Sequence, residues 1–417
     1  MQNVLTGMRV VEGSAFVAAP SGGMTLAQLG ADVIRFDPIA GGIDYRRWPV
    51  TGSGKSIYWH SLNKGKRSIA IDFKRPEGRE ILTRLIASPG EDAGMFLTNF
   101  PARGWLADEA LREHRKDLIY LNLTGDRHGG SALDYTVNSK VGFPFLTGDG
   151  SDSNSNMGTD SGKGRRPINN PLPAWDVIAG QHIALGLLAA ERHRQRTREG
   201  QFVGLALADV ALATVGHLGY IGEAMINGVE REASGNSIYG TFGRDFVSRD
   251  GISLMIVGVS PNQWRAIVEV SGQAAQVAQL ADQMGLNFDK EGDRYAGTDA
   301  LCGIFEPWFA QHDYQQLVSK LDAAGVCWGK YQSIAELVES DIDCSIDNPL
   351  FEQVKQPGIG EYLVPHNPLS FGAAERETPR PAPLLGQHTE EILADLLKLS
   401  SGEIGKLHDS GIVGSPR

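Results

Sequence analysis

Residues 8–37 read MRVVEGSAFVAAPSGGMTLAQLGADVIRFD and contain two short apolar runs on either side of a segment of small residues. The runs MRVVEG and ADVIRFD predict strands, because both are rich in β-branched residues and are bounded by turn-forming ones. Between them, SGGMTLAQLG predicts a helix that ends at Gly30, since glycine readily takes the left-handed conformation at a helix C-terminus. The stretch therefore predicts two parallel strands joined by a helix.

The same alternation of strand and helix continues to about residue 130. KRSIAIDF, AGMFLTNF and LIYLNLTG predict three more strands, and PEGREILTRLIA predicts a helix with Pro76 in its first turn. Near-continuous apolar strands separated by helices favour an α/β fold with a parallel sheet covered on both faces. Because such sheets bind ligands at the carboxyl ends of their strands, we expect the site near 14–19, Lys74 and 99–103.

A dinucleotide site is not indicated by these loops. The segment after the first strand, EGSAFVAAPSGG, lacks the GxGxxG pattern, and the chain has no GxxxxGK[ST] phosphate loop. Asp37 ends the second strand as a ribose-binding acid would, but it has no supporting loop. We therefore do not expect NAD or a nucleoside triphosphate as the ligand.

Composition excludes several classes of protein. A net charge of −11 over 417 residues argues against a general nucleic-acid binder. The three cysteines have no CxxC spacing, which favours a reducing cytoplasm and no metal or disulfide framework. The sequence shows no signal peptide and no apolar run of about 18 residues, the length needed to span a membrane. We expect a cytoplasmic protein that binds neither nucleic acid nor a membrane.

The pattern changes after about residue 220. VGLALADVALATVGHLGYIGEAMIN predicts a helix, GTFGRDFVSRDGISLMIVGVS predicts two strands across an Arg-Asp-Gly turn, and helical patterns follow to about 340. A Pro-rich extended segment and a last helix, TEEILADLLKL, complete the chain. We predict a large domain built from 1–220 and 331–417, with a smaller α+β domain, 221–330, inserted between its two parts.

Asp176 lies at the front of LPAWDVIAGQHIALGLLAAERHRQRTREGQ, a long amphipathic helix pattern. One interpretation is a helix cap, since Asp is a preferred N-cap residue and an apolar helix follows from Val177. The other is a carboxylate nucleophile that the helix dipole keeps ionised. Gly180 and Gly186 inside the helix indicate a close approach by another helix or by a ligand. The residues by themselves favour the cap.

The same stretch carries a family resemblance. DVIAGQHIALGLLAAERHRQRTREGQFV resembles the core signature of the class III CoA-transferase family: an Asp, a Gly four residues on, a G-L/I-L-A-A run and a basic R-x-x-T-x-x-G-Q ending. The blocks NKGKRSIAIDFKRPEGREIL, LTNFPARG and APLLGQHTEEILADLLKLSSGEIGKLHDSGIV occur in the family's order. Several blocks in order are far more specific than one motif, so the chain is identified as a member.

The resemblance implies a Rossmann-like large domain, a smaller inserted domain and an interlocked homodimer. It also implies that Asp176 is the catalytic aspartate. Its carboxylate attacks an acyl-CoA thioester, and an acyl–aspartyl anhydride and then an aspartyl-CoA thioester form. No permanently bound cofactor is implied, because CoA arrives as part of the substrate. The residues that the resemblance assigns to CoA binding are Phe16, Val17, Ala18, Ile71, Lys74, Asn99 and Phe100.

Two positions depart from the family pattern. Pro38 stands where other members carry an Arg after the second strand's acid, so the phosphate contact is expected from Arg35 or Arg46. Leu133 stands where many members have Tyr and where the racemase branch has a His that moves a proton. Leucine cannot act as a base, so racemisation at the α-carbon loses its catalyst.

Within the family, VVEGSAFVAAP, NFPARGWL and YGTFGRDF resemble one branch in particular. That branch moves CoA inside one molecule, between the C1 and C4 carboxyls of mesaconate, in autotrophic 3-hydroxypropionate metabolism. The alternative is an intermolecular transferase that moves CoA between two carboxylic acids. Intramolecular transfer requires a closed site that also binds the second carboxylate; the candidates by charge are Arg47, Lys140, Arg165 and Arg166.

Overall fold

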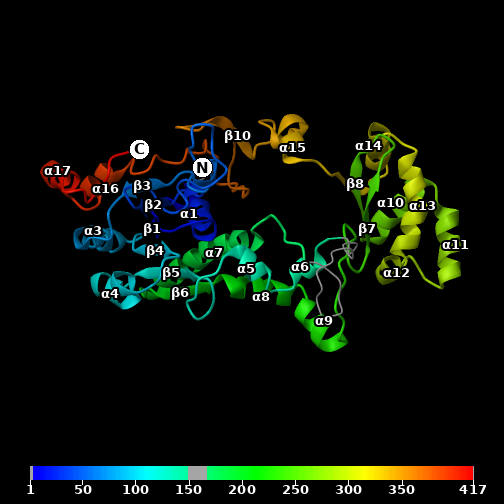
Figure 1. Cartoon of the computed structure of the whole chain (residues 1–417), viewed down its shortest axis with the longest axis horizontal. Coiled ribbons are helices and arrows are strands. Elements are labelled where there is room, and N and C mark those ends of the chain that lie inside the picture. The colour runs from blue at the N-terminus through cyan, green and yellow to red at the C-terminus, as the bar shows by residue number, and fades with distance from the viewer. Residues whose placement is uncertain (1–2, 149–166, 417) are drawn as a thin grey trace, which may run out of the picture. The chain divides into compact units, whose positions relative to one another are not determined.

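The computed structural model describes residues 3–148 and 167–416 (Figure 1). The chain divides into two compact units. The first unit contains 1–141, 171–227 and 342–417, and the second contains 142–170 and 228–341. The sequence-based division gives the smaller domain as 221–330, whereas the second unit covers 228–341 and also includes 142–170, which the sequence leaves in the large domain.

The first unit is built on a six-stranded sheet. Its strands are β1 (Arg9–Gly13), β2 (Asp32–Asp37), β3 (Arg67–Ala70), β4 (Met95–Thr98), β5 (Ile119–Thr124) and β6 (Phe202–Ala206). They lie in the order β3-β2-β1-β4-β5-β6, and every neighbouring pair is parallel. The prediction of an α/β fold with a parallel sheet is confirmed. The order reverses between β1 and β4, and in open sheets of this kind the carboxyl ends at the reversal form a ligand crevice.

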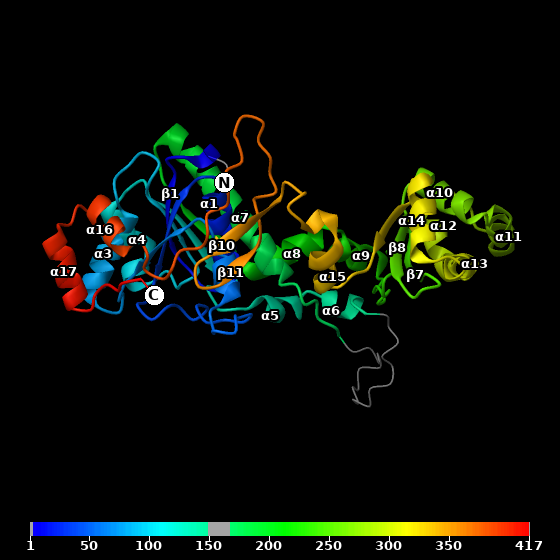
Figure 2. The same cartoon turned by 90° about the horizontal axis from the view of Figure 1, so that it is seen from above.

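Helices cover both faces of this sheet. The helices of the first unit are α1 (Ala18–Gln28), α2 (Ile57–Ser61), α3 (Pro76–Ile86), α4 (Asp108–His114), α5 (Asp134–Asn138), α7 (Ala174–Thr197), α8 (Leu207–His217), α9 (Tyr220–Asn227), α16 (Thr389–Asp395) and α17 (Ser401–Asp409), with short 3-10 turns η1 (Asn3–Leu5), η2 (Gly104–Leu106) and η3 (Ile342–Cys344). Helices α16 and α17 lie beside α3 in both views (Figures 1 and 2), so the C-terminal segment completes the sheet's cover.

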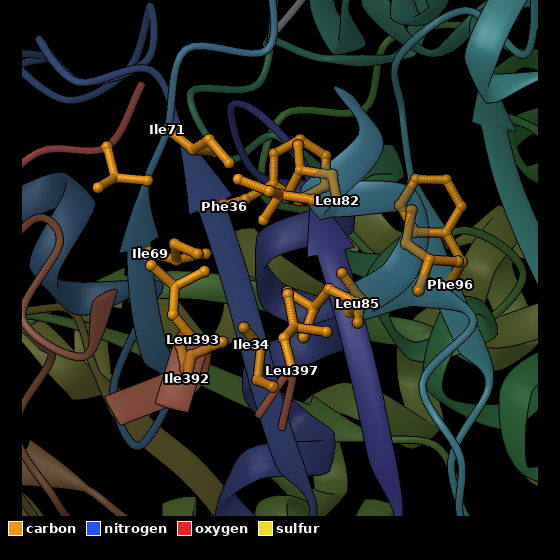
Figure 3. Packing of buried hydrophobic residues seen from close by; sticks show 14 of the residues in the cluster. Ile34, Phe36, Ile69, Ile71, Leu82, Leu85, Phe96, Ile392, Leu393 and Leu397 are labelled. Carbon is orange, nitrogen blue, oxygen red and sulfur yellow. The ribbon is translucent and has the colours of Figure 1, made fainter. Parts of the chain in front are cut away.

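The core between the sheet and helices α3 and α16 explains why the strands are continuous apolar runs in the sequence. Ile34 and Ile69, from adjacent strands, pack against Leu85 of α3 and Leu393 of α16 (Figure 3). All four side chains are buried, and full burial of each contributes about 1.5–3 kcal/mol. The opposite faces of the strands are buried too, which explains why polar alternation is absent from the sequence.

The prediction of a single helix over residues 203–227 is wrong. The stretch 203–227 does not form a single helix, because β6 comes first and α8 and α9 follow, separated near Gly219, whose φ is +84°. Alanine and leucine in GLALA carry a helical propensity, but backbone pairing with β5 overrides it at the edge of the sheet.

The second unit is an antiparallel sheet with helices. Strands β7 (Phe242–Val247) and β8 (Ser253–Gly258) form the expected hairpin, and β9 (Cys327–Lys330), which the sequence did not indicate, pairs with β8. Its helices are α6 (Phe143–Leu146), α10 (Pro261–Ser271), α11 (Ala274–Met284), α12 (Glu291–Ala296), α13 (Thr298–Ala310), α14 (Tyr314–Ala323) and α15 (Ile334–Ser340). Phe242, Trp264 and Phe305 meet edge to face at its centre.

The Pro-rich segment is only partly irregular. It begins inside a hairpin in the first unit, made by β10 (Phe351–Gln356) and β11 (Gly360–Pro365). Within residues 3–148 and 167–416, no helix combines the length and the apolarity that crossing a bilayer requires.

Candidate active site

A cavity of about 320 Å³ opens at the carboxyl ends of β1, β4 and β5, in the first unit. Its position is the point where the strand order reverses. It is lined by Ala15, Phe16, Ala18, Ile43, Asn99, Phe100, Pro101, Leu123, Thr124, Gly125, Gly129, Gly130, Ser131, Ala132, Leu133, Asp176 and Leu207. Five residues that the sequence assigned to the site therefore line this one cavity: Phe16, Ala18, Asn99, Phe100 and Asp176.

The interpretation of Asp176 as a helix cap is wrong. Helix α7 begins at Ala174, so Asp176 lies inside its first turn. The capping acceptor comes from Asp134, 42 residues earlier, whose Oδ2 accepts the backbone N–H of Asp176 at 2.9 Å. Because Asp134 stabilises the helix start, the Asp176 carboxyl is left to line the cavity.

The ionisation of Asp176 differs from the expectation based on the helix dipole. The pKa of the carboxyl is raised to about 7, because burial and, after it, the negative charge of Asp134 raise it while Arg47 opposes the rise. Desolvation disfavours the charged form, and here it outweighs a helix terminus whose contribution is about 1 kcal/mol. Near neutral pH both forms of Asp176 are therefore populated.

Close helix packing places Asp176 beside the loop that follows β1. A Cβ on Gly180 would lie 2.1 Å from Ser21 Oγ, and one on Gly22 would lie 2.6 Å from Ile183 Cγ2. Helices α1 and α7 therefore approach each other where only glycine fits. Gly186 faces the sheet, where a Cβ on it would lie 3.1 Å from Leu121 Cδ1. This answers the question left open by the sequence: both helix glycines serve packing.

Asn99 closes the loop after β1 against the end of β4. Its Oδ1 accepts the N–H of Ala15 at 3.0 Å, and its Nδ2 donates to the carbonyl of Ala15 at 2.8 Å. Thr98 adds a bond from Oγ1 to the carbonyl of Gly13 at 2.6 Å. Both ends of the Asn99 amide are used on the backbone, so Asn99 shapes the wall of the cavity.

Three residues assigned to CoA do not line the cavity. Val17 lies between two lining residues, directly before α1. Ile71 is buried in the core, and its backbone bridges to Val413. Lys74 is exposed beyond β3, and its N–H bonds to Asp72. Contact of these residues with CoA stays a prediction.

The expectation that Arg35 binds a phosphate is wrong. Its buried guanidinium donates to both oxygens of Asp37 at 2.9 and 3.0 Å, to the carbonyl of Ser14 at 3.0 Å and to Asp44 at 3.3 Å. The same bonds occupy Asp37, so this acid is not available to a ribose. Arg46 is exposed and remains the candidate.

Among the cations proposed for a second carboxylate, Arg47 is the one beside the cavity. Its guanidinium lies 5.5 Å from the centre of the Phe16 ring and 5.3 Å from that of Tyr58. Its charge acts on Asp176, whose pKa it lowers. Lys140 is exposed on the surface, and Arg165 and Arg166 lie outside the described residues.

Sequence reasoning missed two parts of the site. The glycine-rich loop after β5, from Gly125 to Leu133, lines the cavity, and the rule that ligands bind at strand carboxyl ends would have indicated it. Tyr58 also lies within electrostatic range of Asp176. The pKa of its hydroxyl is raised to about 12, mainly by burial, and the charge of Asp176 contributes to the rise. No local pattern marks Tyr58, because only the fold brings it near.

Comparisons with known proteins agree with this geometry. The family model for CoA-transferase family III matches residues 5–389. The 2-methylfumaryl-CoA isomerase of Chloroflexus aurantiacus is 53% identical over 417 residues, covering 100% of this chain and 99% of that protein. The succinyl-CoA:mesaconate CoA-transferase of Haloarcula hispanica is 27% identical, covering 93% and 95%. A CaiB/BaiF family protein of Brucella suis has a similar structure, with a TM-score of 0.74, 25% identity, and coverage of 95% and 100%.

Proposed function

The chain belongs to CoA-transferase family III, and from this premise we propose that it moves CoA between the C1 and C4 carboxyls of mesaconate within one molecule. The reaction converts 2-methylfumaryl-CoA to 3-methylfumaryl-CoA, so the enzyme is a CoA transferase acting as an isomerase. The observation that carries the proposal is the 53% identity to such an isomerase over the whole chain. The presence of Asp176 in the cavity wall supports it.

The proposed mechanism uses Asp176 as a covalent carrier. Its carboxylate attacks the thioester carbonyl, CoA leaves as a thiolate, and an acyl–aspartyl anhydride forms. The thiolate attacks the aspartyl carbonyl, which gives an aspartyl-CoA thioester and free mesaconate. The other carboxylate of mesaconate repeats these steps in reverse, which restores Asp176. No oxidation occurs, and each step exchanges one acyl bond for another.

Two features of the cavity support this chemistry. A pKa of about 7 leaves a fraction of Asp176 ionised at neutral pH, as attack on a thioester requires. The developing oxyanion needs N–H donors. Ser131 and Ala132 line the cavity, and the backbone N–H of each has no hydrogen-bond acceptor within the described part of the chain. We propose these two N–H groups as those donors.

The assembly is part of the same proposal: an interlocked homodimer in the cytoplasm, with CoA entering as part of the substrate and no permanently bound cofactor. Exposed apolar side chains on α9 support an interface there, since Met225 and Ile226 are 81% and 84% exposed beside Ile221. Contiguous apolar patches of this kind mark contact sites. Sedimentation of the purified protein as a monomer at micromolar concentration would count against it.

The deciding experiment supplies purified protein with 2-methylfumaryl-CoA and no free acid. The proposal expects 3-methylfumaryl-CoA to form. In a parallel sample that also contains labelled free mesaconate, it expects little label in the product. An absolute requirement for a free acid would instead support an intermolecular transferase, such as the succinyl-CoA:mesaconate CoA-transferase of Haloarcula hispanica. Asp176→Asn is the control, because it removes the nucleophile and keeps the side-chain shape.

A further inference from the structure

Phe16 has an unusual backbone conformation for a residue with a side chain. It lies in the loop after β1, lines the cavity, and has a φ of +69°. In this left-handed region the Cβ of an L-residue crowds its own backbone, and the preference against it is equivalent to roughly 5- to 30-fold. Something in the fold must hold Phe16 there.

The side chain of Asp44 supplies that hold. Its Oδ2 accepts the backbone N–H of Phe16 at 3.0 Å. Asp44 is buried, and its carboxylate is itself fixed by Arg35, whose Nη2 lies 3.3 Å from Oδ1. Arg35 also donates to the carbonyl of Ser14 in the same loop. A charged acceptor in a rigid, buried ion pair makes a stronger hydrogen bond than a neutral one.

A second link joins Asp44 to the ring of Phe16. The carbonyl of Asp44 accepts the N–H of Arg47 at 3.0 Å, which closes a turn. That turn carries the Arg47 guanidinium over the face of the Phe16 ring, 5.5 Å from its centre. Asp44 therefore acts on Phe16 twice, through the backbone and through the cation that covers the ring.

We propose that Asp44 is a positioning residue that fixes Phe16 in the left-handed conformation and so sets the cavity wall that Phe16 shares with Asp176. The effect on ligand binding rests on the proposed function, because it takes the cavity as the CoA site. The competing explanation is that Asp44 serves only as a counter-ion for Arg35.

Asp37 provides a matched control for that explanation. It is buried and bonded to the same guanidinium, at 2.9 and 3.0 Å, whereas the N–H of Phe16 is bonded to Asp44. If Asp44 only neutralised Arg35, Asp37→Ala and Asp44→Ala would behave alike. Under our proposal both variants lose stability, and only Asp44→Ala loosens the loop.

The first measurement needs no ligand. Amide hydrogen exchange of residues 14–18 is compared between the full-length wild type, Asp44→Ala and Asp37→Ala. We expect exchange about tenfold faster or more in Asp44→Ala and a change below about twofold in Asp37→Ala. Equal acceleration in both variants, or none in Asp44→Ala, overturns the proposal. If either alanine variant fails to fold, Asp44→Asn and Asp37→Asn are compared with the same expected order.

The second measurement is the affinity for CoA, determined by calorimetry with and without Asp44→Ala in proteins that carry Phe, Ala or Gly at position 16. Phe16→Ala and Phe16→Gly both remove the ring, but only glycine takes the left-handed conformation without strain. We expect Asp44→Ala to weaken CoA binding about 5- to 30-fold with Phe or Ala at position 16 and less than about twofold with Gly. An equal loss in all three backgrounds contradicts a positioning role. Failure of the wild type to bind CoA refutes the proposed function, and hydrogen exchange then decides the role of Asp44.

Discussion

Replacing Asp176 by Asn should make the protein more stable, by an amount that depends on pH. Burial raises the pKa of the folded-state carboxyl from 3.8 to about 7, which means that folding disfavours its ionised form. Asparagine has nearly the same shape and carries no charge, so it avoids that cost. The nucleophile proposed for catalysis is thus a source of instability in the free enzyme.

The magnitude follows from linkage between protonation and folding. A rise of about 3 pKa units, at about 1.4 kcal/mol each, sets an upper limit of about 4 kcal/mol. The carboxyl borders a cavity of about 320 Å³, which is large enough to hold water. Solvent in the cavity screens the charge, so we expect about 2 kcal/mol.

The sign of the pH dependence is fixed by which state ionises first. Below about pH 4 both states hold the proton, and Asp176→Asn gains nothing. Between about pH 4 and 7 the unfolded state ionises while the folded state does not, so wild-type stability falls with rising pH relative to the variant. Above about pH 7 both states are ionised and the difference stays constant.

Urea unfolding of the wild type and Asp176→Asn from pH 4 to 9, at one protein concentration, measures this difference. Asp299→Asn is the control, because Asp299 occupies the first turn of α13 with its side chain 99% exposed. We expect the control to change the free energy of unfolding by less than about 0.5 kcal/mol at every pH. A difference for Asp176→Asn that is the same at pH 4 and pH 8, or is absent, would refute the argument.

Three further predictions concern the same site. The kcat/KM of the isomerase reaction should rise about tenfold from pH 6 to pH 8, because the ionised fraction of Asp176 grows from about 0.09 to about 0.9. A flat profile contradicts the pKa of about 7. In Asp134→Asn the midpoint of that pH profile should move to lower pH, since the amide oxygen still accepts the Asp176 N–H but the repelling charge is gone. A shift to higher pH would exclude charge repulsion by Asp134 as a cause of the raised pKa. Gly180→Ala should lower the free energy of unfolding by about 1–3 kcal/mol. Adding Ser21→Gly should recover part of the loss, because Ser21 Oγ is the nearest atom to the new Cβ. Thermal unfolding of the single and the double variant tests whether this contact limits how closely α1 and α7 approach.

The sheet was predictable where local sequence carried enough apolar residues. Strands β1 to β5 of the first unit stand out because they are buried on both faces and therefore almost continuously apolar. Strand β6 was missed because its edge position leaves Phe202 and Gly204 exposed, and because its Leu and Ala residues favour helix. Strand β9, CWGK, was missed because its residues are exposed or only half-buried, so it carries no apolar run.

By itself the sequence determined the order of strands β1 to β5, because apolar runs and glycine stops act over a few residues. Through its family blocks it also indicated Asp176 as the nucleophile. Only the tertiary structure decided how that residue behaves, since the acceptor that caps its helix lies 42 residues away. Burial, which raises its pKa, and the hold of Asp44 on Phe16 likewise arise from segments that meet only in the fold. Short-range preferences can be seen in a linear pattern, whereas desolvation and long-range hydrogen bonds depend on which segments the folded chain brings together.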